Sequence, residues 1–157
     1  MSGFRRGIRL GIDVGRARVG VARCDPDGML AVPVETVPRD DASIERLAQL
    51  AAEYEPLEFV VGLPVNMQGA DTASTTDARE FADALARRTG IAVRLVDERL
   101  STVSAHSALR ASGRSQKNSR SIVDQVAAVV LLQQAIDMEK SSGNPAGAPV
   151  DLDEENH

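Results

Sequence analysis

Three acidic residues stand where carboxylates could act together on a metal ion. Asp13 lies within an otherwise apolar strand pattern, Glu98 follows the apolar stretch 91–96, and Asp124 lies in the first turn of a predicted helix. Metal-assisted phosphoryl transfer needs oxygen ligands from separate elements, because Mg²⁺ takes only one or two carboxylates besides water and substrate oxygens. The three positions therefore fit a divalent-metal site that acts on a phosphodiester.

Asp13 also has a simpler interpretation as a surface acid. Apolar residues alternate from 8 to 14, so Arg9, Gly11 and Asp13 share the opposite face of the predicted strand. If that face met water, Asp13 would pair with Arg9 or Arg16. The glycines at 11, 15 and 20 favour the metal site instead, because missing side chains let a ligand approach the backbone.

The other acids have structural interpretations as well. Asp97 and Glu98 could simply end a strand and pair with Arg99 on the surface. Asp124 could complete a capping box that begins at Ser121. However, Asp124 shares its helix face with small and apolar residues, where an inward carboxylate needs a cation or a donor.

The elements that must position these acids follow a simple order. Short apolar or alternating segments predict strands over residues 8–14, 19–23, 29–37, 57–63 and 91–96. Apolar periodicity and end signals predict helices over about 43–54, 77–88, 102–111 and 122–139, with a polar, unpacked loop over 112–120. The order βββαβαβαα predicts an α/β fold with a mixed five-stranded sheet and helices packed on it.

Length and composition predict one domain with a tail. Residues 1–140 are expected to form the domain, because a chain of 157 residues can bury a core without disulfides, and Cys24 stands alone. Residues 141–157 are rich in Gly and Pro and hold four acids without a base, which predicts a disordered acidic tail. The sequence has no apolar run typical of a membrane span or signal peptide, so we expect a cytoplasmic protein.

The charge distribution points to nucleic acid although the net charge is −5. The segment 99–123 contains no acid and carries the bases Arg99, Arg110, Arg114, Lys117 and Arg120. Such a segment is typical of contact with a phosphate backbone, although it could also be a solvated connector. Dinucleotide-binding, phosphate-loop, zinc and nucleophile-triad motifs are absent from the sequence, which argues against those chemistries.

Four sequence blocks resemble those of the YqgF/RuvX family. They are Gly11–Ala22, Val61–Gly69, Asp97–Thr102 and Asp124–Ala128 in the expected order, and the resemblance covers about residues 7–138. Ser101 departs from the Thr that is usual in the family. The resemblance implies a ribonuclease H-like fold, related to the RuvC resolvases, with a metal-dependent nuclease site. The family is described both as a nuclease for 5′-end maturation of pre-16S ribosomal RNA and as a Holliday junction resolvase, so both substrates stay open.

The resemblance also assigns roles by position. Asp13, Glu98 and Asp124 would hold two Mg²⁺ or Mn²⁺ ions, with Asp97 as the alternative to Glu98. Phosphate contacts are expected from Arg16 and Arg18 beside the cut, from Asn66, and from the basic residues of segment 99–123. We expect a nucleic-acid partner and no membrane, for either a monomer or a homodimer.

Two other functions are compatible with the same sequence features. The Asp-x-Gly hairpin around Asp13 resembles the first phosphate loop of the actin, sugar-kinase and Hsp70 ATPases, but those proteins need a second such domain. A chain that keeps the fold without catalysis would instead be a nucleic-acid-binding module. ATP hydrolysis would identify the first function, and binding unaffected by chelation would identify the second.

Overall fold

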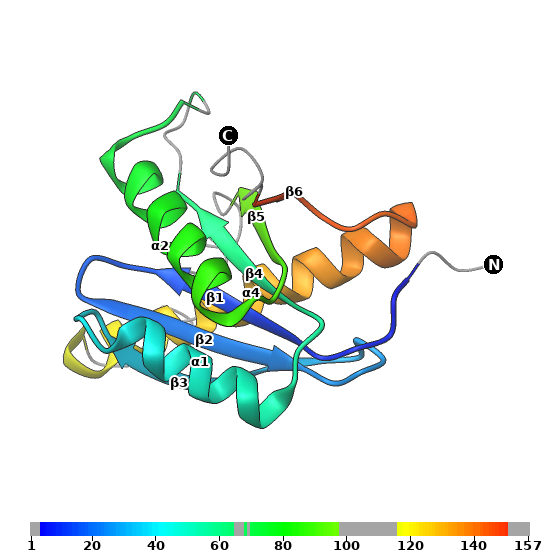
Figure 1. Ribbon diagram of the computed structural model, residues 1–157, viewed down its shortest axis with the longest axis horizontal. Coiled ribbons are helices and arrows are strands. Elements are labelled where there is room, and N and C mark those ends of the chain that lie inside the picture. Colours follow the sequence, from blue (N-terminus) through cyan, green and yellow to red (C-terminus); the bar gives the residue numbers. More distant parts are fainter. Residues whose placement is uncertain (1–3, 65–67, 69, 98–115, 151–157) are drawn as a thin grey trace.

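The centre of the fold is a six-stranded mixed sheet (Figure 1). The computed structural model describes residues 4–64, 68, 70–97 and 116–150, with the backbone alone for 116–124. The sheet has the order β3-β2-β1-β4-β5-β6. Its strands are β1 (Arg9–Val14), β2 (Arg18–Cys24), β3 (Ala31–Pro38), β4 (Glu58–Leu63), β5 (Val93–Asp97) and β6 (Ala148–Pro149). The strands β1, β4 and β5 run parallel, and β2, β3 and β6 pair antiparallel to their neighbours.

Helices cover both faces of this sheet. The helices α1 (Ser43–Tyr54) and α2 (Ala73–Thr89) lie on one face, and α4 (Gln116–Ser142) crosses the other (Figure 1). Each face has its own cluster of buried apolar side chains. The central strand β4 is apolar on both sides for this reason, as is typical of sheets covered by helices. Among the described residues, no helix combines the length and apolar character needed to span a membrane.

The predicted fold class is confirmed, with differences in the elements. All five predicted strands form, and the first two predicted helices correspond to α1 and α2. The sheet gains a sixth strand, β6, because the chain after α4 returns to the free edge of β5. The predicted helix over 102–111 lies outside the described residues. The prediction of an unpacked loop up to residue 120 is wrong from Gln116 onward, because α4 begins there.

The segment after α4 is more ordered than its composition suggests. The guanidinium of Arg94 on β5 donates to the backbone oxygens of Ala146 and Gly147, at 2.7 and 2.9 Å. The Val150 N–H donates to the Val93 oxygen at 2.8 Å. These hydrogen bonds, together with the burial of Ala146 and the packing of Val150 on the core, hold the segment on the sheet, so the prediction of disorder from residue 141 does not hold over 141–150. Residues 151–157 lie outside the described part of the chain.

Helix α4 packs closely on β1 at a glycine. A methyl group placed on Gly11 would lie 2.8 Å from Cβ of Leu132 and 2.9 Å from the backbone oxygen of Ala128. The missing side chain therefore serves helix packing at this position. The expectation that Gly11 leaves room for a ligand is wrong.

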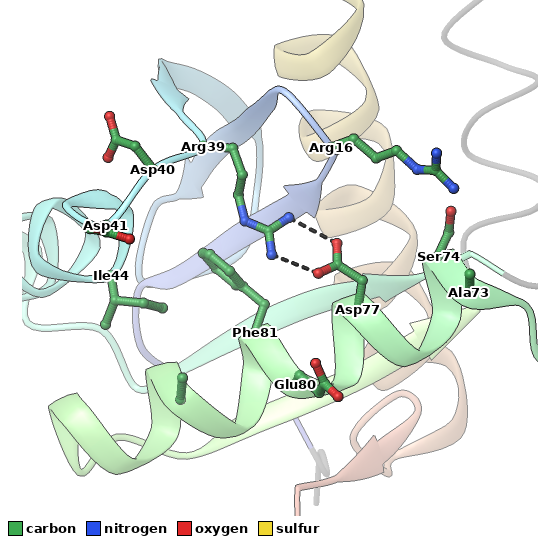
Figure 2. Close-up of a pocket in the computed structure, with 11 residues that line it drawn as sticks. Arg16, Arg39, Asp40, Asp41, Ile44, Ala73, Ser74, Asp77, Glu80 and Phe81 are labelled. Atoms are coloured by element: carbon green, nitrogen blue, oxygen red, sulfur yellow. Dashed lines mark hydrogen bonds and ion pairs between the residues drawn. The ribbon is translucent and has the colours of Figure 1, made fainter.

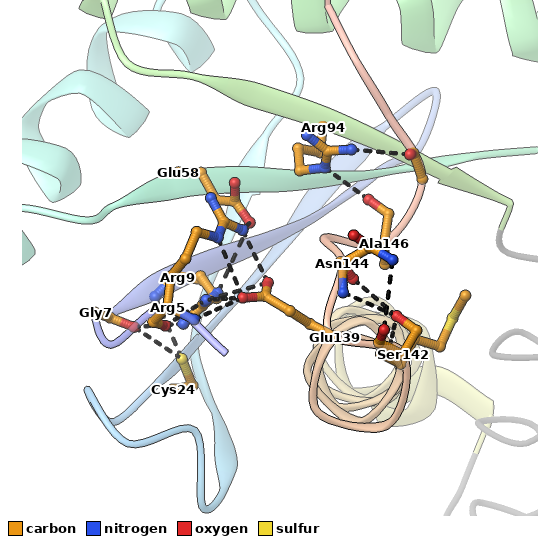
Figure 3. A network of polar contacts seen from close by, with 12 residues as sticks. Arg5, Gly7, Arg9, Cys24, Glu58, Arg94, Glu139, Ser142, Asn144 and Ala146 are labelled. Atoms are coloured by element: carbon orange, nitrogen blue, oxygen red, sulfur yellow. Dashed lines mark hydrogen bonds and ion pairs between the residues drawn. The ribbon is translucent and has the colours of Figure 1, made fainter. Parts of the chain in front are cut away.

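A buried ion cluster fastens the last turns of α4 to the start of β1 (Figure 3). Arg9 and Glu139 are 1 % and 2 % exposed, and their side chains approach within 3.1 Å. Arg5 donates to both oxygens of Glu139, at 2.8 and 2.9–3.1 Å, and also contacts Glu58 at 3.0 Å. Burial opposes ionisation of Glu139, but the hydrogen bonds from Arg5 and the charge of Arg9 outweigh it and lower its pKa to about 2. This cluster and Gly11 fix the line along which α4 crosses the sheet.

Candidate active site

Asp13 lies near the carboxyl end of β1, on the face that α4 covers. The apolar residues of β1 pack toward α1 and α2, so Gly11 and Asp13 face the other way. Gly11 lies against Ala128 of α4, and Asp13 is half-buried two residues further along the strand. One helical turn before Ala128, the chain carries Asp124. The two predicted ligands therefore belong to elements that lie against each other.

The strand register shows how far along the sheet α4 reaches. Asp13 is paired with Gly20 of β2, and Gly20 is paired with Thr36 of β3. The side-chain amide of Gln125 donates to Oγ1 of Thr36 at 2.8 Å. The residue that follows Asp124 in α4 is thus anchored to the row of the sheet that contains Asp13.

The end of β5 lies at the same edge of the sheet. Across the three parallel strands, the register puts Leu95 level with Ile12. Val96 is therefore level with Asp13, and it packs against α4. Asp97 ends the strand, exposed, and strand alternation gives it the opposite face. The carboxyl ends of β1 and β5 thus converge, as the predicted metal site requires.

Several predicted site residues fall outside what the structure describes. These are Asn66, Glu98, Arg99, Arg110 and Arg114. For Lys117, Arg120 and Asp124 the structure gives only the backbone, which belongs to α4. Among the described side chains, no three of His, Cys, Asp or Glu lie close enough together to hold a metal ion. The acidic set as a whole therefore stays a prediction.

Of the simpler interpretations, the pairing of Asp13 with Arg9 and the capping box at Asp124 are wrong. Arg9 does not form an ion pair with Asp13, because the Arg9 guanidinium is bound within the ion cluster at the other end of β1. Asp124 does not complete a helix-capping box, because α4 begins at Gln116 and residues 121–124 lie inside the helix. A carboxylate inside a helix that packs on a sheet gains nothing from the free N–H groups of a helix start.

The turn between β1 and β2 carries the two predicted phosphate contacts, Arg16 and Arg18. The Gly15 N–H donates to the Arg18 oxygen at 2.8 Å, and a methyl group on Gly15 would lie 2.7 Å from that oxygen. Gly15 therefore permits the tight closure of the turn rather than the approach of a ligand. Arg16 is exposed at the tip, and Arg18 is half-buried at the start of β2.

A cavity of about 660 Å³ opens beside this turn (Figure 2). The turn, the start of α1 and the first three turns of α2 surround it, and Arg16 lies across from Ser74 at its wall. Arg39 and Asp77 meet inside it as a two-point ion pair, with distances of 2.7 and 2.9 Å. The sequence gives no local sign of this pair, because its members lie 38 residues apart and belong to no motif.

Solved structures with the same fold include those of the RuvC resolvase. The structure described as T. thermophilus RuvC in complex with Holliday junction substrate matches 88 % of this chain and 98 % of that chain, with a TM-score of 0.56 and 16 % identity. A second structure, of Thermus thermophilus RuvC, gives a TM-score of 0.53 at 15 % identity over 85 % of this chain and 97 % of that chain. These matches confirm the predicted ribonuclease H-like fold.

Curated relatives are similar over nearly their whole length. A protein of Clavibacter sepedonicus is 55 % identical over 94 % of this chain and 93 % of its own, and one of Streptomyces coelicolor is 55 % identical over 95 % and 91 %. Both carry the name "Putative pre-16S rRNA nuclease", which agrees with the predicted nuclease. The model of the RuvX family, described as Holliday junction resolvase, matches residues 7–138. The chain therefore belongs to the RuvX family, as its four sequence blocks predict.

Proposed function

We propose that this chain is a divalent-metal-dependent nuclease that trims the 5′ end of pre-16S ribosomal RNA. The observation that carries the proposal is the place of Asp13, half-buried at the carboxyl end of a central strand and facing α4. A carboxylate in such a position can bind a cation together with carboxylates from neighbouring elements. The anchoring of Gln125 to the same row of the sheet brings the helix that carries Asp124 to this point.

The residues of this edge fit a hard cation. Carboxylate oxygens from three different parts of the chain are offered by Asp13, Glu98 and Asp124. Gly20, which is paired with Asp13, adds no side chain that would fill the space between these carboxylates. The three carboxylates would hold one or two Mg²⁺ or Mn²⁺ ions. When bound, such ions would polarise the phosphodiester and supply an activated water. The carboxylates themselves would orient the ions against the scissile phosphate.

Strand alternation favours Glu98 over Asp97 as a ligand. Val96 packs toward α4, so Asp97 faces α1 and α2. The same alternation predicts that Glu98, the next residue, lies on the α4 face, as Asp13 does. An Asp97→Asn variant is therefore expected to keep its activity, whereas Glu98→Gln is expected to lose it. The opposite outcome would reassign the ligand.

The substrate is expected to bind mainly through its phosphates. Arg16 and Arg18 lie at the sheet edge that carries Asp13. Further from the cut, the nucleic-acid backbone would be contacted by Asn66 and the basic residues of segment 99–123. Such contacts position a backbone without reading bases. The chain has three Phe and one Tyr, so stacking on bases is a minor mode at most.

Branched DNA is the second candidate substrate. It is supported by the description of the family model and by the fold shared with RuvC. Cutting two symmetric strands of a junction would favour a homodimer, whereas trimming one RNA end would not. The names of the more similar relatives favour RNA as the first choice.

The decisive experiment compares the two substrates with one inactive variant. We expect purified protein with Mg²⁺ or Mn²⁺ to cleave a pre-16S 5′-end RNA faster than a four-way DNA junction. Asp13→Asn should lower the cleavage rate at least about hundredfold, since loss of a metal ligand costs more than loss of its supporting residues. Asp83→Asn, which changes a partly exposed acid paired with Arg87 on α2, is the matched control.

The outcomes separate the parts of the proposal. Undiminished turnover by Asp13→Asn would reject the site, and faster junction cleavage would make the protein a resolvase. Cleavage of neither substrate, together with binding that survives chelation, would identify a nucleic-acid-binding module.

A further inference from the structure

Arg39 makes hydrogen bonds to the turn on both sides of Arg16. It is the first residue after β3, and its backbone N–H donates to the Ala17 oxygen at 2.9 Å. Its guanidinium donates to the Gly15 oxygen, also at 2.9 Å. The two carbonyls belong to the residues immediately before and after Arg16. The side chain and the backbone N–H of Arg39 thus both hold the tip of the turn in place.

Arg39 is itself held in place by α2. Its guanidinium makes two hydrogen bonds to the carboxylate of Asp77 and lies 4.9 Å from the ring centroid of Phe81. The planar fork of an arginine suits such two-point pairing. The hydrogen bond to Asp77 raises the pKa of Arg39, and the hydrogen bond from Arg39 lowers the pKa of Asp77. Both groups stay charged across the pH range in which a nuclease works.

The acid of this pair is close to both arginines. Asp77 balances the charge of Arg39, and the charge of Arg16 is close enough to lower the pKa of Asp77 further. In Figure 2 the Asp77 carboxylate points to Arg39, while Arg16 extends along the cavity wall. Arg16 therefore stays exposed, on a turn whose backbone is fixed.

We propose that Arg39 is a positioning residue that acts through Arg16. By bracing the carbonyls of Gly15 and Ala17, it fixes the point from which Arg16 reaches the phosphate next to the scissile bond. The turn leaves β1 two residues after Asp13, so its position also sets the distance between that phosphate and the cut. The inference rests on the proposed function, in which Arg16 binds phosphate.

A purely structural role makes a different prediction. If Arg39 only joined β3 to α2, its loss would lower stability and leave substrate binding through Arg16 untouched. If it acts through Arg16, its loss should matter only while Arg16 is present. Two residues that act through one contact give non-additive effects, which a double-mutant cycle measures.

The experiment is a cycle of Arg16→Met, Arg39→Met and the double variant. Cleavage kinetics are measured on the pre-16S 5′-end RNA, and thermal unfolding is measured in parallel. We expect Arg39→Met to raise KM about fivefold to tenfold, as for the loss of one charge-assisted contact, with kcat nearly unchanged. In the Arg16→Met background, the same change should alter KM by less than about twofold.

Two further variants keep the test independent of folding. The charge-swapped pair Arg39→Asp with Asp77→Arg restores an ion pair but not the bond to the Gly15 oxygen, so it should recover stability without recovering KM. Arg46→Met is the matched control. It removes an equivalent two-point pair with Glu35, at 2.7 and 2.8 Å, which makes no contact with the turn. This control should leave KM unchanged.

The outcomes distinguish this inference from the proposed function. Equal effects of Arg39→Met with and without Arg16, or a charge swap that restores KM, would overturn the inference while the nuclease stands. If the protein binds the RNA without cleaving it, the nuclease proposal fails and the same cycle is read from Kd by fluorescence anisotropy. A protein that binds neither the RNA nor the junction would overturn both.

Discussion

Glu139 is the single residue on which the buried ion cluster depends. Its carboxylate is 2 % exposed and accepts hydrogen bonds from both Arg5 and Arg9. Glu139→Gln would leave two guanidinium groups with only Glu58 as a counter-charge. We expect the free energy of unfolding to fall by about 3–5 kcal/mol, the usual cost of breaking a buried pair, as measured by urea denaturation.

The matched control is Glu45→Gln at an exposed ion pair. Arg88 and Glu45 also make two hydrogen bonds, at 2.8 and 3.0 Å, but their side chains are 50 % and 54 % exposed. Water screens such a pair, so the loss should stay below about 1 kcal/mol. Equal losses in the two variants would show that burial does not set the strength of the cluster.

The same cluster predicts how stability depends on pH. The pKa of Glu139 falls from its ordinary 4.5 to about 2 on folding, so its contribution is complete above pH 4.5. The folded state binds its proton less readily than the unfolded state, so stability is lost as the pH falls from 4.5 toward 2. In this window the melting temperature of Glu139→Gln should fall less steeply than that of the parent. Parallel curves would contradict the assignment.

At the level of elements, the contact between β1 and α4 decides the geometry of the proposed site. Gly11→Ala places a methyl group 2.8 Å from Leu132 and 2.9 Å from the Ala128 oxygen, so α4 must move outward. Overpacking of this kind costs about 1–3 kcal/mol. Because α4 also carries Asp124, cleavage should fall by more than the loss of folded protein explains. Denaturation and the rate per folded molecule check the two effects separately.

Gly90 offers a control that separates packing from backbone strain. It ends α2 at φ +70°, and a methyl group there would meet no atom within 4 Å. Gly90→Ala should therefore lower stability by about 1 kcal/mol through its backbone alone and leave cleavage unchanged. A loss of cleavage equal to that of Gly11→Ala would contradict the role of the helix contact.

The elements that the sequence predicts are those with a local pattern. Alternating and apolar runs identify β1 to β5, and 3.6-residue periodicity identifies α1, α2 and residues 122–139 of α4. The start of α4 is polar over 116–120, so it has no periodic signal that a reader of the sequence could detect. The two residues of β6 form a strand only because β5 leaves an edge to pair with.

At the scale of the whole molecule, an acidic protein must bind a polyanion through a local charge excess. The net charge is −5, and the acid-free segment 99–123 is the region expected to meet the phosphates. Replacing Arg114 and Lys117 by Ala should reduce the slope of log Kd against log salt by roughly 0.7 per lost contact on single-stranded RNA. Binding titrations at several salt concentrations measure this slope.

An equal change of charge elsewhere is the control for this prediction. Arg87 and Arg88 end α2, where each pairs with an acid on the surface. Replacing both by Ala removes the same net charge from a different part of the molecule, so the salt slope should stay the same. If both double variants changed the slope equally, total charge rather than the segment would govern binding.

The site was predictable only where its residues carry a motif. Asp13 and Asp124 belong to sequence blocks, and the structure brings their elements together. Arg9 illustrates the limit, since its partner Glu139 lies 130 residues away and the strand pattern alone offered Asp13 instead. Ion pairs between distant segments follow from the completed fold, and no local pattern encodes them.

The ion cluster also has a consequence for synthesis of the chain. Arg9 belongs to the first and central strand, and the ribosome adds its partner Glu139 only 130 residues later. At about 5–20 residues per second, roughly ten seconds pass between the synthesis of Arg9 and that of Glu139, and until then Glu58 is the acid of the cluster that is present. The cluster is therefore complete only once the end of α4 has been made, and the part of the helix that carries Asp124 has been made by then. A nascent chain of this protein would therefore not have the proposed site assembled before α4 has been made.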